Sequence, residues 1–371
     1  MLTILHTSDW HLGKEYRQFD DPINLKLSQE RLLTVKNIMR QAQQRNVDAV
    51  LCGGDLFDTH DPKKDWWQGL LDLFASFHTW DKPVILLPGN HDPLMNGSVY
   101  ESTHRFRRGL PSWANVVDSE NREFAIDDRA VIYSTPCSSK AGAPDVATKL
   151  PTREPGDKRI RIGLIHGQTW DRSVANFPIS KQAAKERGLD YLALGDTHSF
   201  EEVTPDETAP VVYCGTPEPT RFGEDAPGQI VFVRFRRSGQ RPKIERQPVG
   251  RFNWREENVN RLSELADLVG EDLSSTVLRL KLNLTVSVSE DVQLERLLDR
   301  LRGTDALPMS TAAFQCDRNV RVSTDELEID PTWPPTIQEV AAKLKSNSAD
   351  PQSQRALLKL LRLVNELSEA E

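Results

Sequence analysis

Short apolar runs alternate with longer amphipathic segments in residues 1–250. Apolar side chains recur every three or four positions in segments 29–45 and 65–77, which predicts two helices. Continuous apolar runs predict buried strands at 2–7, 49–52, 83–87, 130–134, 161–165, 191–194, 211–214 and 230–235. The stretch 138–157 is polar and contains several prolines and glycines, which is typical of a loop. Strands that first alternate with helices and then follow one another predict a layered α/β domain with helices outside.

The hydrophobic pattern changes near residue 251. Segment 276–288 alternates between apolar and polar side chains, which is the pattern of a half-buried strand. Its neighbours predict helices at 256–268 and 291–301 and a weaker strand at 311–322. Prolines then punctuate the chain at 331–335, and two further helices are predicted at 336–345 and 351–367. We therefore expect a layered domain, a small β-α-β unit and a helical C-terminal segment, at 1–250, 251–330 and 331–371.

The overall composition is that of an ordinary soluble protein. With 38% hydrophobic and 27% charged residues, the 371-residue chain is able to bury a sizeable core. No stretch approaches the roughly 20 apolar residues needed to span a bilayer, and the first residues lack the pattern of a signal peptide. The four cysteines are far apart and form no Cys-x-x-Cys pair, which favours a reduced, cytoplasmic protein without a zinc-thiolate site. The net charge of −8 argues against bulk attraction to nucleic acid, but a local basic patch is compatible with it.

Five polar clusters each follow a predicted strand. They are Asp9-Trp10-His11, Gly54-Asp55-Leu56-Phe57-Asp58, Gly89-Asn90-His91-Asp92, His166-Gly167 and Gly195-Asp196-Thr197-His198. A single Asp-x-His is more often structural than metal-binding, but ligand sites in α/β sheets gather where several strands end. The neighbouring glycines allow sharp turns and close approach of the backbone. Carboxylates, imidazoles and one amide form a mixed oxygen and nitrogen ligand set that suits Mn²⁺, Fe or Zn²⁺.

The order of these clusters resembles the calcineurin-like metallophosphoesterase superfamily, whose motifs are D-x-H, GD-x-x-D, GNHD, HG and G-x-x-H. Within that superfamily, segments 5–13 and 54–58 resemble the SbcD-type nucleases, which are subunits of a bacterial DNA repair complex. The resemblance covers residues 1–250 well and extends more loosely to the β-α-β unit, which is similar to a capping domain. It implies a β-sandwich flanked by helices, followed by a small α/β capping domain and a helical tail.

The resemblance also implies a site for two divalent metal ions, Mn²⁺ or Mg²⁺. One ion would be held by Asp9, His11 and His198, and the other by Asn90 and His166, with Asp55 bridging the two. His91 would face the scissile phosphate, and Asp92 would orient the His91 ring. Asp58 would be structural or would support the ligands from behind.

The last motif departs from the family pattern. It is commonly G-H-x-H, and here it reads Gly195-Asp196-Thr197-His198, so that an aspartate stands where a histidine ligand is expected. An aspartate oxygen lies as many bonds beyond Cβ as a histidine Nδ1, so we expect the Asp196 carboxylate to act as a metal ligand in its place. The alternative, that Asp196 orients a neighbouring histidine, stays open.

Several residues near the motifs are candidates for contacts with substrate or partner. Lys14 follows the first motif, and Arg221 lies in a loop after a strand, so both are candidate phosphate contacts; Arg221 could instead pair with Glu224. Trp66 and Trp67 are interpreted as packing residues of the predicted helix rather than as stacking platforms for bases. The apolar face of helix 354–367 predicts either docking of a partner or packing against its own chain.

The function implied by the resemblance is that of a metal-dependent DNA nuclease that hydrolyses phosphodiester bonds. Its partners would be DNA and an SbcC-like coiled-coil ATPase, with a homodimer inside a larger DNA repair complex; exonuclease and endonuclease action both stay open. One alternative is a phosphoesterase for a small nucleotide or a phosphoprotein, which has less need of the extra domain and tail. The other is a non-catalytic scaffold that binds an ATPase or DNA, which only the change at Asp196 favours.

Overall fold

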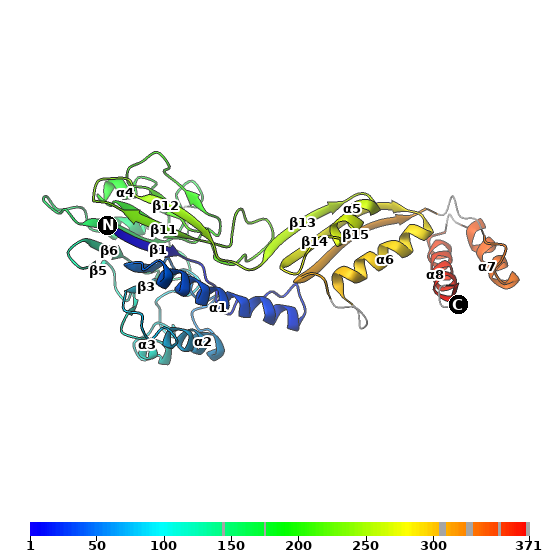
Figure 1. The fold of residues 1–371 in the computed structure, drawn as a ribbon, viewed down its shortest axis with the longest axis horizontal. Coiled ribbons are helices and arrows are strands. Elements are labelled where there is room, and N and C mark those ends of the chain that lie inside the picture. Colours follow the sequence, from blue (N-terminus) through cyan, green and yellow to red (C-terminus); the bar gives the residue numbers. More distant parts are fainter. Residues whose placement is uncertain (143–144, 174–175, 304–308, 324–328, 348–349, 369–371) are drawn as a thin grey trace. The chain divides into compact units, whose positions relative to one another are not determined.

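The computed structural model describes residues 1–371 except 143–144, 174–175, 304–308, 324–328, 348–349 and 369–371. The chain forms two compact units, Met1–Phe252 and Asn253–Glu371 (Figure 1). Every predicted metal ligand lies in the first unit. Among the described residues, no helix is both long enough and apolar enough to cross a membrane.

Two six-stranded sheets form the first unit. The first sheet contains, in order, β12 (Lys243–Pro248), β11 (Gln229–Phe235), β1 (Leu2–Thr7), β2 (Ala49–Cys52), β3 (Val84–Leu86) and β4 (Ala114–Val116). The second contains β5 (Arg122–Ile126), β6 (Ala130–Ser134), β7 (Ile160–His166), β8 (Tyr191–Gly195), β10 (Val211–Tyr213) and β9 (Glu201–Glu202). The helices are α1 (Asp21–Gln44), α2 (Lys64–Ala75), α3 (Arg105–Gly109), the 3-10 helix η1 (Val146–Lys149) and α4 (Ala183–Glu186). All eight predicted strands form in this unit, and the layered α/β fold is confirmed.

The strands that the sequence did not predict are short or polar. β4 and β9 contain three and two residues, and both are too short to show a period. β5 and β12 lie at the edges of their sheets and expose much of their surface, so their side chains are not apolar at regular intervals. Helix α1 begins before the predicted start, because Asp20 caps it by accepting from the Ile23 N–H at 3.0 Å.

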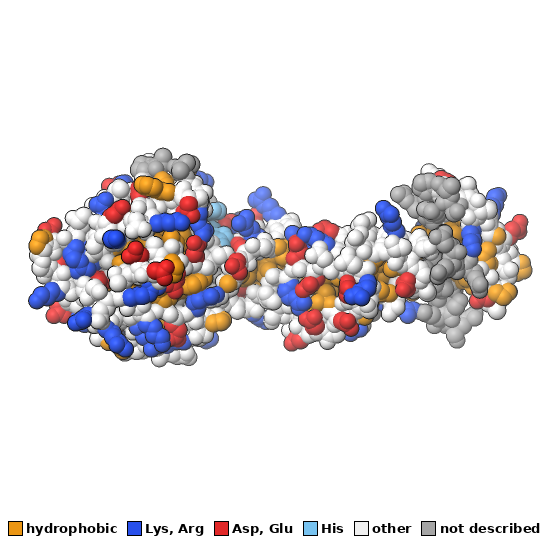
Figure 2. All heavy atoms as spheres, turned by 90° about the horizontal axis from the view of Figure 1, so that it is seen from above, with side chains coloured by type: hydrophobic (Ala, Val, Ile, Leu, Met, Phe, Trp, Pro, Cys, Tyr) orange, Lys and Arg blue, Asp and Glu red, His pale blue; other side chains and the backbone are white. Residues whose placement is uncertain are grey.

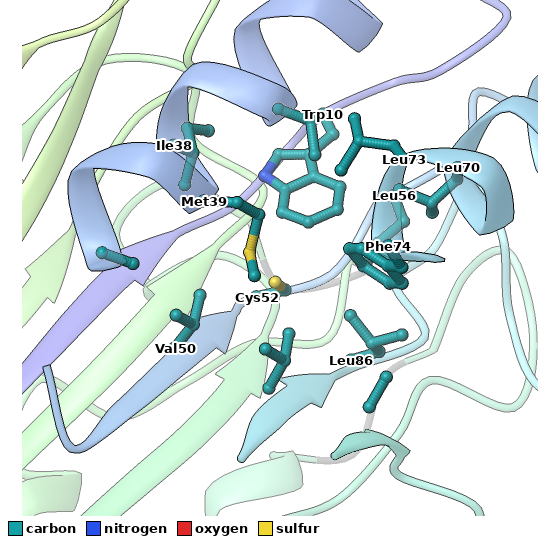
Figure 3. Close-up of a cluster of buried hydrophobic side chains, with 14 of the residues drawn as sticks. Trp10, Ile38, Met39, Val50, Cys52, Leu56, Leu70, Leu73, Phe74 and Leu86 are labelled. Atoms are coloured by element: carbon teal, nitrogen blue, oxygen red, sulfur yellow. The ribbon is translucent and has the colours of Figure 1, made fainter. Parts of the chain in front are cut away.

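The central strands are buried on both faces. In β2, Val50 faces the layer of α1 and α2, whereas Ala49 and Leu51 face the second sheet. Figure 3 shows the helix-side layer, in which Trp10 lies among side chains from both helices and from the strands. Since both faces are fixed by packing, the ends of the strands are held rigidly, and these ends carry the polar clusters.

His6 is fully buried in β1, and burial lowers its pKa to about 3. Its Nδ1 lies 3.0 Å from the Tyr191 hydroxyl. In the unfolded chain His6 takes up a proton below about pH 6.5, but in the folded chain it stays neutral, so stability falls as pH drops through this range. We expect the wild-type protein to lose about 2 kcal/mol more stability than His6→Gln between pH 7 and pH 5. Urea unfolding in EDTA at both pH values measures this, and equal losses would contradict it.

The second unit is built on a three-stranded parallel sheet in the order β13-β14-β15. Its elements are β13 (Asn253–Val259), α5 (Leu262–Val269), β14 (Thr276–Val286), α6 (Val288–Arg302) and β15 (Ala313–Val322). The alternating leucines of β14 pack against α5 and α6, as the alternation predicted.

The predicted helix at 256–268 is wrong in its first half, where the chain forms β13. The unit is therefore β-α-β-α-β rather than β-α-β. Ion pairs across the sheet stabilise β13, whose side chains do not alternate between apolar and polar. Glu256 pairs with Lys281 at 2.6 Å and with Arg279 at 3.3 Å. Glu264 then accepts from the Asn260 and Arg261 backbone N–H groups and starts α5.

Two helices end the second unit, α7 (Pro335–Ser346) and α8 (Pro351–Ser368). Leu357 and Leu361 of α8 are buried against Ala341 of α7, so part of the apolar face of α8 packs on its own chain. Leu363 remains 49% exposed. That residues 331–371 form a separate segment that binds a partner stays a prediction.

Candidate metal centre

The predicted ligands lie on loops at the carboxyl ends of parallel strands in the two sheets. The loop after β1 is tied to the loop after β2, because the Asp9 and His11 N–H groups donate to the carbonyls of Gly54 and Asp55 at 3.0 and 2.9 Å. Asp9, His11, Asp55 and Asp196 all adopt positive φ angles of 55°, 43°, 52° and 97°. Backbone strain of this kind is concentrated at functional sites, because the surrounding structure must hold it in place.

Two glycines allow the loops to approach one another. A Cβ atom on Gly54 would lie 2.3 Å from Nδ1 of His166, and Gly54 also has a φ of 100°. A Cβ atom on Gly89 would lie 2.1 Å from Oδ1 of Asp55. Side chains at these positions would therefore displace two of the predicted ligands.

Asp55 lies at the centre of the site. Its Oδ1 accepts from the His91 N–H at 2.9 Å, while its Oδ2 lies 3.8 Å from His11 Nε2 and 3.5 Å from His166 Nε2. One carboxylate oxygen is thus held by backbone, and the other lies between two imidazoles. Burial raises the pKa of Asp55 to about 7, Asp9 adds to this shift and His166 opposes it.

On one side of Asp55, two imidazole nitrogens face each other. Nε2 of His11 lies 3.2 Å from Nε2 of His198. Nδ1 of His198 is 2.8 Å from Glu224 Oε1 and 2.9 Å from the Thr220 hydroxyl, so Nδ1 carries a proton and Nε2 is left toward His11. Burial and the neighbouring His198 hold the pKa of His11 well below its usual range, which keeps this ring neutral. Burial opposes a charge on His198, but the Glu224 and Asp9 carboxylates outweigh it and raise the pKa of His198. Asp9, His11 and His198 together offer a carboxylate and two ring nitrogens that could hold a cation.

On the other side of Asp55, His166 faces several oxygens. Its Nδ1 lies 2.8 Å from the Gly53 carbonyl, which can only accept, so in the neutral ring Nδ1 carries the proton and Nε2 the lone pair. Nε2 is 3.5 Å from Asp55 Oδ2, 3.4 Å from Asn90 Oδ1 and 3.6 Å from Asp196 Oδ1. Burial opposes a charge on His166, but the carboxylates outweigh it and raise the pKa well above the usual range. These groups therefore require a positive charge among them, and a divalent cation fits the donor set.

Asp196 is held by two amides. Its Oδ1 accepts from Asn90 Nδ2 at 3.0 Å and from Asn176 Nδ2 at 2.8 Å, and its backbone N–H lies 3.2 Å from both carboxylate oxygens of Asp9. The structure thus brings Asp196 to the His166 side of the site. Asn176 was not predicted, because it lies in a polar loop without a recognisable motif.

We expect Asp196→Ala to reduce the bound metal from two ions to one, because it removes a carboxylate beside His166 and leaves the other set intact. Asp196→His should keep two ions and part of the activity, if His at this position supplies an equivalent donor. Metal analysis of both purified variants tests this. Two ions in Asp196→Ala would show that Asp196 only orients its neighbours.

The predicted role of Asp92 is wrong. Its buried carboxylate does not orient His91; it accepts from the N–H groups of Phe57 and Gly89 at 2.9 and 2.8 Å and from the Tyr100 hydroxyl at 2.6 Å. Asp92 therefore fixes the two loops that carry Asp55 and Asn90. The His91 ring is instead supported by the Asp58 carbonyl, 3.2 Å from Nδ1, and is 47% exposed.

Lys14 lies at the rim of the site, with Nζ 3.5 Å from Asp58 Oδ1. Arg221 is 79% exposed and its Nε is 4.0 Å from Glu224 Oε1, so it is an outlying residue whose contact with substrate stays a prediction. Histidine side chains are visible at the surface of the first unit in Figure 2.

The role of Arg31 beside the site was not predicted from the sequence. It is 1% exposed and donates to the carbonyls of Trp10, Asp9 and Pro219 at 2.6, 3.1 and 3.1 Å. It therefore ties the loop of the first motif to the loop that leads to Glu224. The predicted helix 29–45 contains three arginines, Arg31, Arg40 and Arg45, and the sequence does not set Arg31 apart from the other two.

The chain is similar to known phosphoesterases and nucleases. The profile of the Calcineurin-like phosphoesterase family matches residues 2–200. Similar proteins include the uncharacterized metallophosphoesterase YhaO of Bacillus subtilis, 25% identical over 237 residues, with 60% of this chain and 55% of that protein covered. The SbcD component of the nuclease SbcCD of Escherichia coli is 24% identical over 287 residues, covering 66% of this chain and 67% of that protein.

A third relative is the DNA double-strand break repair protein Mre11 of Methanosarcina acetivorans. It is 30% identical over 266 residues, which cover 68% of this chain and 39% of that protein. The matched region thus spans about half of YhaO and less of this Mre11. Since the family profile covers residues 2–200, more than half of the 371 residues, the chain belongs to the calcineurin-like phosphoesterases.

Proposed function

We propose that this protein is a divalent-metal-dependent DNA nuclease that hydrolyses phosphodiester bonds with two metal ions. The observation that carries the proposal is the position of Asp55, whose Oδ2 lies between His11 on one side and His166 on the other. The matches to SbcD and to Mre11 support DNA as the substrate.

The residues of the chain divide the work as follows. Asp9, His11 and His198 would hold one ion; Asn90, His166 and Asp196 would hold the other; Asp55 would bridge them. When bound, two such ions would activate a water molecule and neutralise the charge that develops on the phosphate. Glu224 keeps His198 in the tautomer that leaves Nε2 free to bind, and the Gly53 carbonyl does the same for His166.

His91 supplies acid–base chemistry in this proposal. The Asp58 carbonyl accepts from Nδ1, which leaves Nε2 of an exposed ring to carry or release a proton at the leaving oxygen. Lys14, beside Asp58, would neutralise a phosphate at the same rim. Three carboxylates, Asp9, Asp55 and Asp196, make a hard, anionic ligand set, which favours Mn²⁺ or Mg²⁺ over softer metals.

Cleavage assays separate this proposal from its alternatives. The purified protein with Mn²⁺ should cut labelled single- or double-stranded DNA and also hydrolyse bis-p-nitrophenyl phosphate. Hydrolysis of the small phosphodiester without DNA cleavage would favour a small-substrate phosphoesterase. If the protein binds metal but shows neither activity, the result would favour a non-catalytic scaffold that binds an ATPase or DNA.

The same proposal includes an SbcC-like coiled-coil ATPase and a homodimer within the complex. Removal of the residues after Pro335 should abolish association with such an ATPase, because α7 and α8 would be its docking site, and should leave hydrolysis of bis-p-nitrophenyl phosphate intact. Size-exclusion chromatography of the mixture measures association.

A pair of point variants controls for unfolding of the truncated chain. Leu363→Asp changes an exposed leucine of α8 and should weaken association, whereas Leu33→Asp changes an exposed leucine of the first unit, 53% exposed, and should not. Normal association of the truncated protein, or loss of its hydrolysis, would contradict the docking role.

A further inference from the structure

A groove leads away from the metal centre along the loop that follows His11. It consists of two adjoining hollows of about 400 and 370 Å³. Both are lined by Gly13, Glu15, Lys63 and Trp66, so the two hollows meet at these four residues. The first hollow is also lined by Asp58, and the second by side chains of α1, which include Leu25.

Asp58 connects this groove to the reaction site. Its Oδ1 lies 3.1 Å from Nδ1 of His11 and 3.5 Å from Nζ of Lys14, and its carbonyl lies 3.2 Å from Nδ1 of His91. The groove thus begins at the residues that flank the proposed position of the scissile phosphate. A group attached to that phosphate would enter the groove next.

Trp66 forms an aromatic wall of both hollows. Its indole ring packs against Gly13, where an added Cβ would lie 2.8 Å from Trp66 Cδ1 and where φ is 88°. The residue was predicted to serve helix packing, and it does pack on the core layer, but it also remains partly exposed to the groove. Because Gly13 has no side chain, it leaves room for the Trp66 ring beside the first motif.

The Trp66 indole N–H makes no hydrogen bond to another described residue. The N–H groups of Trp10 and Trp80, in contrast, donate to Thr7 Oγ1 at 2.9 Å and to the Lys82 carbonyl at 2.6 Å. A partly exposed indole with a free donor, at a groove that also carries polar side chains, is suited to bind a flat polar ring.

A weak ion pair crosses the groove. Lys63 Nζ lies 3.1 Å from Glu15 Oε1, and these side chains are 78% and 41% exposed. Exposed pairs of this kind contribute little stability, so the pair can part for a ligand. Lys63 would then be available to a phosphate.

We propose that this groove is a subsite for a nucleotide adjacent to the scissile phosphate, with its base stacked on Trp66. The inference rests on the proposed nuclease function. Each hollow lies within the lower range of small-ligand sites, and aromatic stacking accepts any base because every base has a π face. Since a base inside a duplex is already stacked on its neighbours, the groove selects an unpaired nucleotide, in a single strand or at a frayed end.

The test compares two substrates with three proteins. The substrates are a single-stranded oligonucleotide and a chain of the same length made of abasic residues. The wild-type protein with Mn²⁺ should cleave the first with a kcat/KM roughly 5- to 150-fold higher, the range that alanine substitution gives for base stacking. Trp66→Leu keeps an apolar side chain on Gly13 and should reduce this ratio to near one, whereas Trp66→Phe should keep most of it.

Metal content and thermal unfolding of each variant show whether the site and fold are intact. An unchanged ratio in Trp66→Leu, or equal losses on both substrates, would overturn the inference and leave the nuclease proposal standing. If the wild-type protein cleaves neither substrate, cleavage of duplex DNA tests the proposed function, and fluorescence anisotropy of the two labelled chains tests the groove. In that case, equal binding of the two chains by the wild-type protein, or a base preference that Trp66→Leu retains, would overturn the inference.

Discussion

The Asp55→Ala variant should lose both metal ions, and its rate of phosphodiester hydrolysis should fall by more than about 100-fold. This loss is larger than the loss expected from removing a residue that only hydrogen-bonds to a metal ligand. The reason is the position of the carboxylate. Oδ2 lies between His11 and His166, so both sets of ligands lose an anionic member, while Oδ1 ceases to hold the His91 backbone. Metal analysis after dialysis against micromolar Mn²⁺, together with the rate on bis-p-nitrophenyl phosphate, measures the effect.

The fold should survive this change, because the Asp55 side chain belongs to neither of the hydrophobic clusters that pack against the sheets. Asp118→Ala is a matched control: this carboxylate of the first unit pairs with Arg107 at the surface, at 2.8 Å, and its loss should alter neither metal content nor rate. A folded Asp55→Ala protein with full activity would refute the proposed site.

His91→Ala should lower turnover about 10²- to 10⁴-fold, the range for loss of an acid–base group, and should retain both metal ions. The side chain is 47% exposed, and its Nδ1 is directed to the Asp58 carbonyl rather than to the ligand groups around Asp55. The backbone N–H of residue 91, which donates to Asp55, is unaffected by the substitution.

Turnover and metal content must be measured on the same preparation of the His91 variant. His78→Ala, at an exposed position of the first unit, serves as the control for replacement of a histidine. Loss of a metal ion together with activity would make His91 a ligand, and the division between binding and chemistry would then be wrong.

The main sheets and the location of the site could be predicted from the sequence, because both depend on local pattern. Apolar runs such as Leu2–Thr7 and Tyr191–Gly195 have one stable place, inside the sandwich, and polar motifs at their ends must then meet at a common edge. β13 could not be predicted in this way, since Glu256 is held by ion pairs across the sheet rather than by apolar alternation.

The residues that support the ligands could not be predicted, because their contacts depend on tertiary structure. Glu224 reaches His198 across 26 residues, and Arg31 reaches Pro219 across 188. Asp92 has the sequence of a motif residue, but the Tyr100 hydroxyl and two backbone donors turn it away from His91. A motif thus identifies where a side chain is anchored, whereas its direction is set by the donors around it.

Anomalous diffraction from crystals of the protein soaked in saturating Mn²⁺ tests the central claim most directly, because it locates each ion independently of activity. We expect two peaks about 3.5–4 Å apart, one contacting His11 and His198, the other contacting His166 and Asn90, with Asp55 between them. A single peak, or an Asp55 carboxylate that contacts neither ion, would contradict the account.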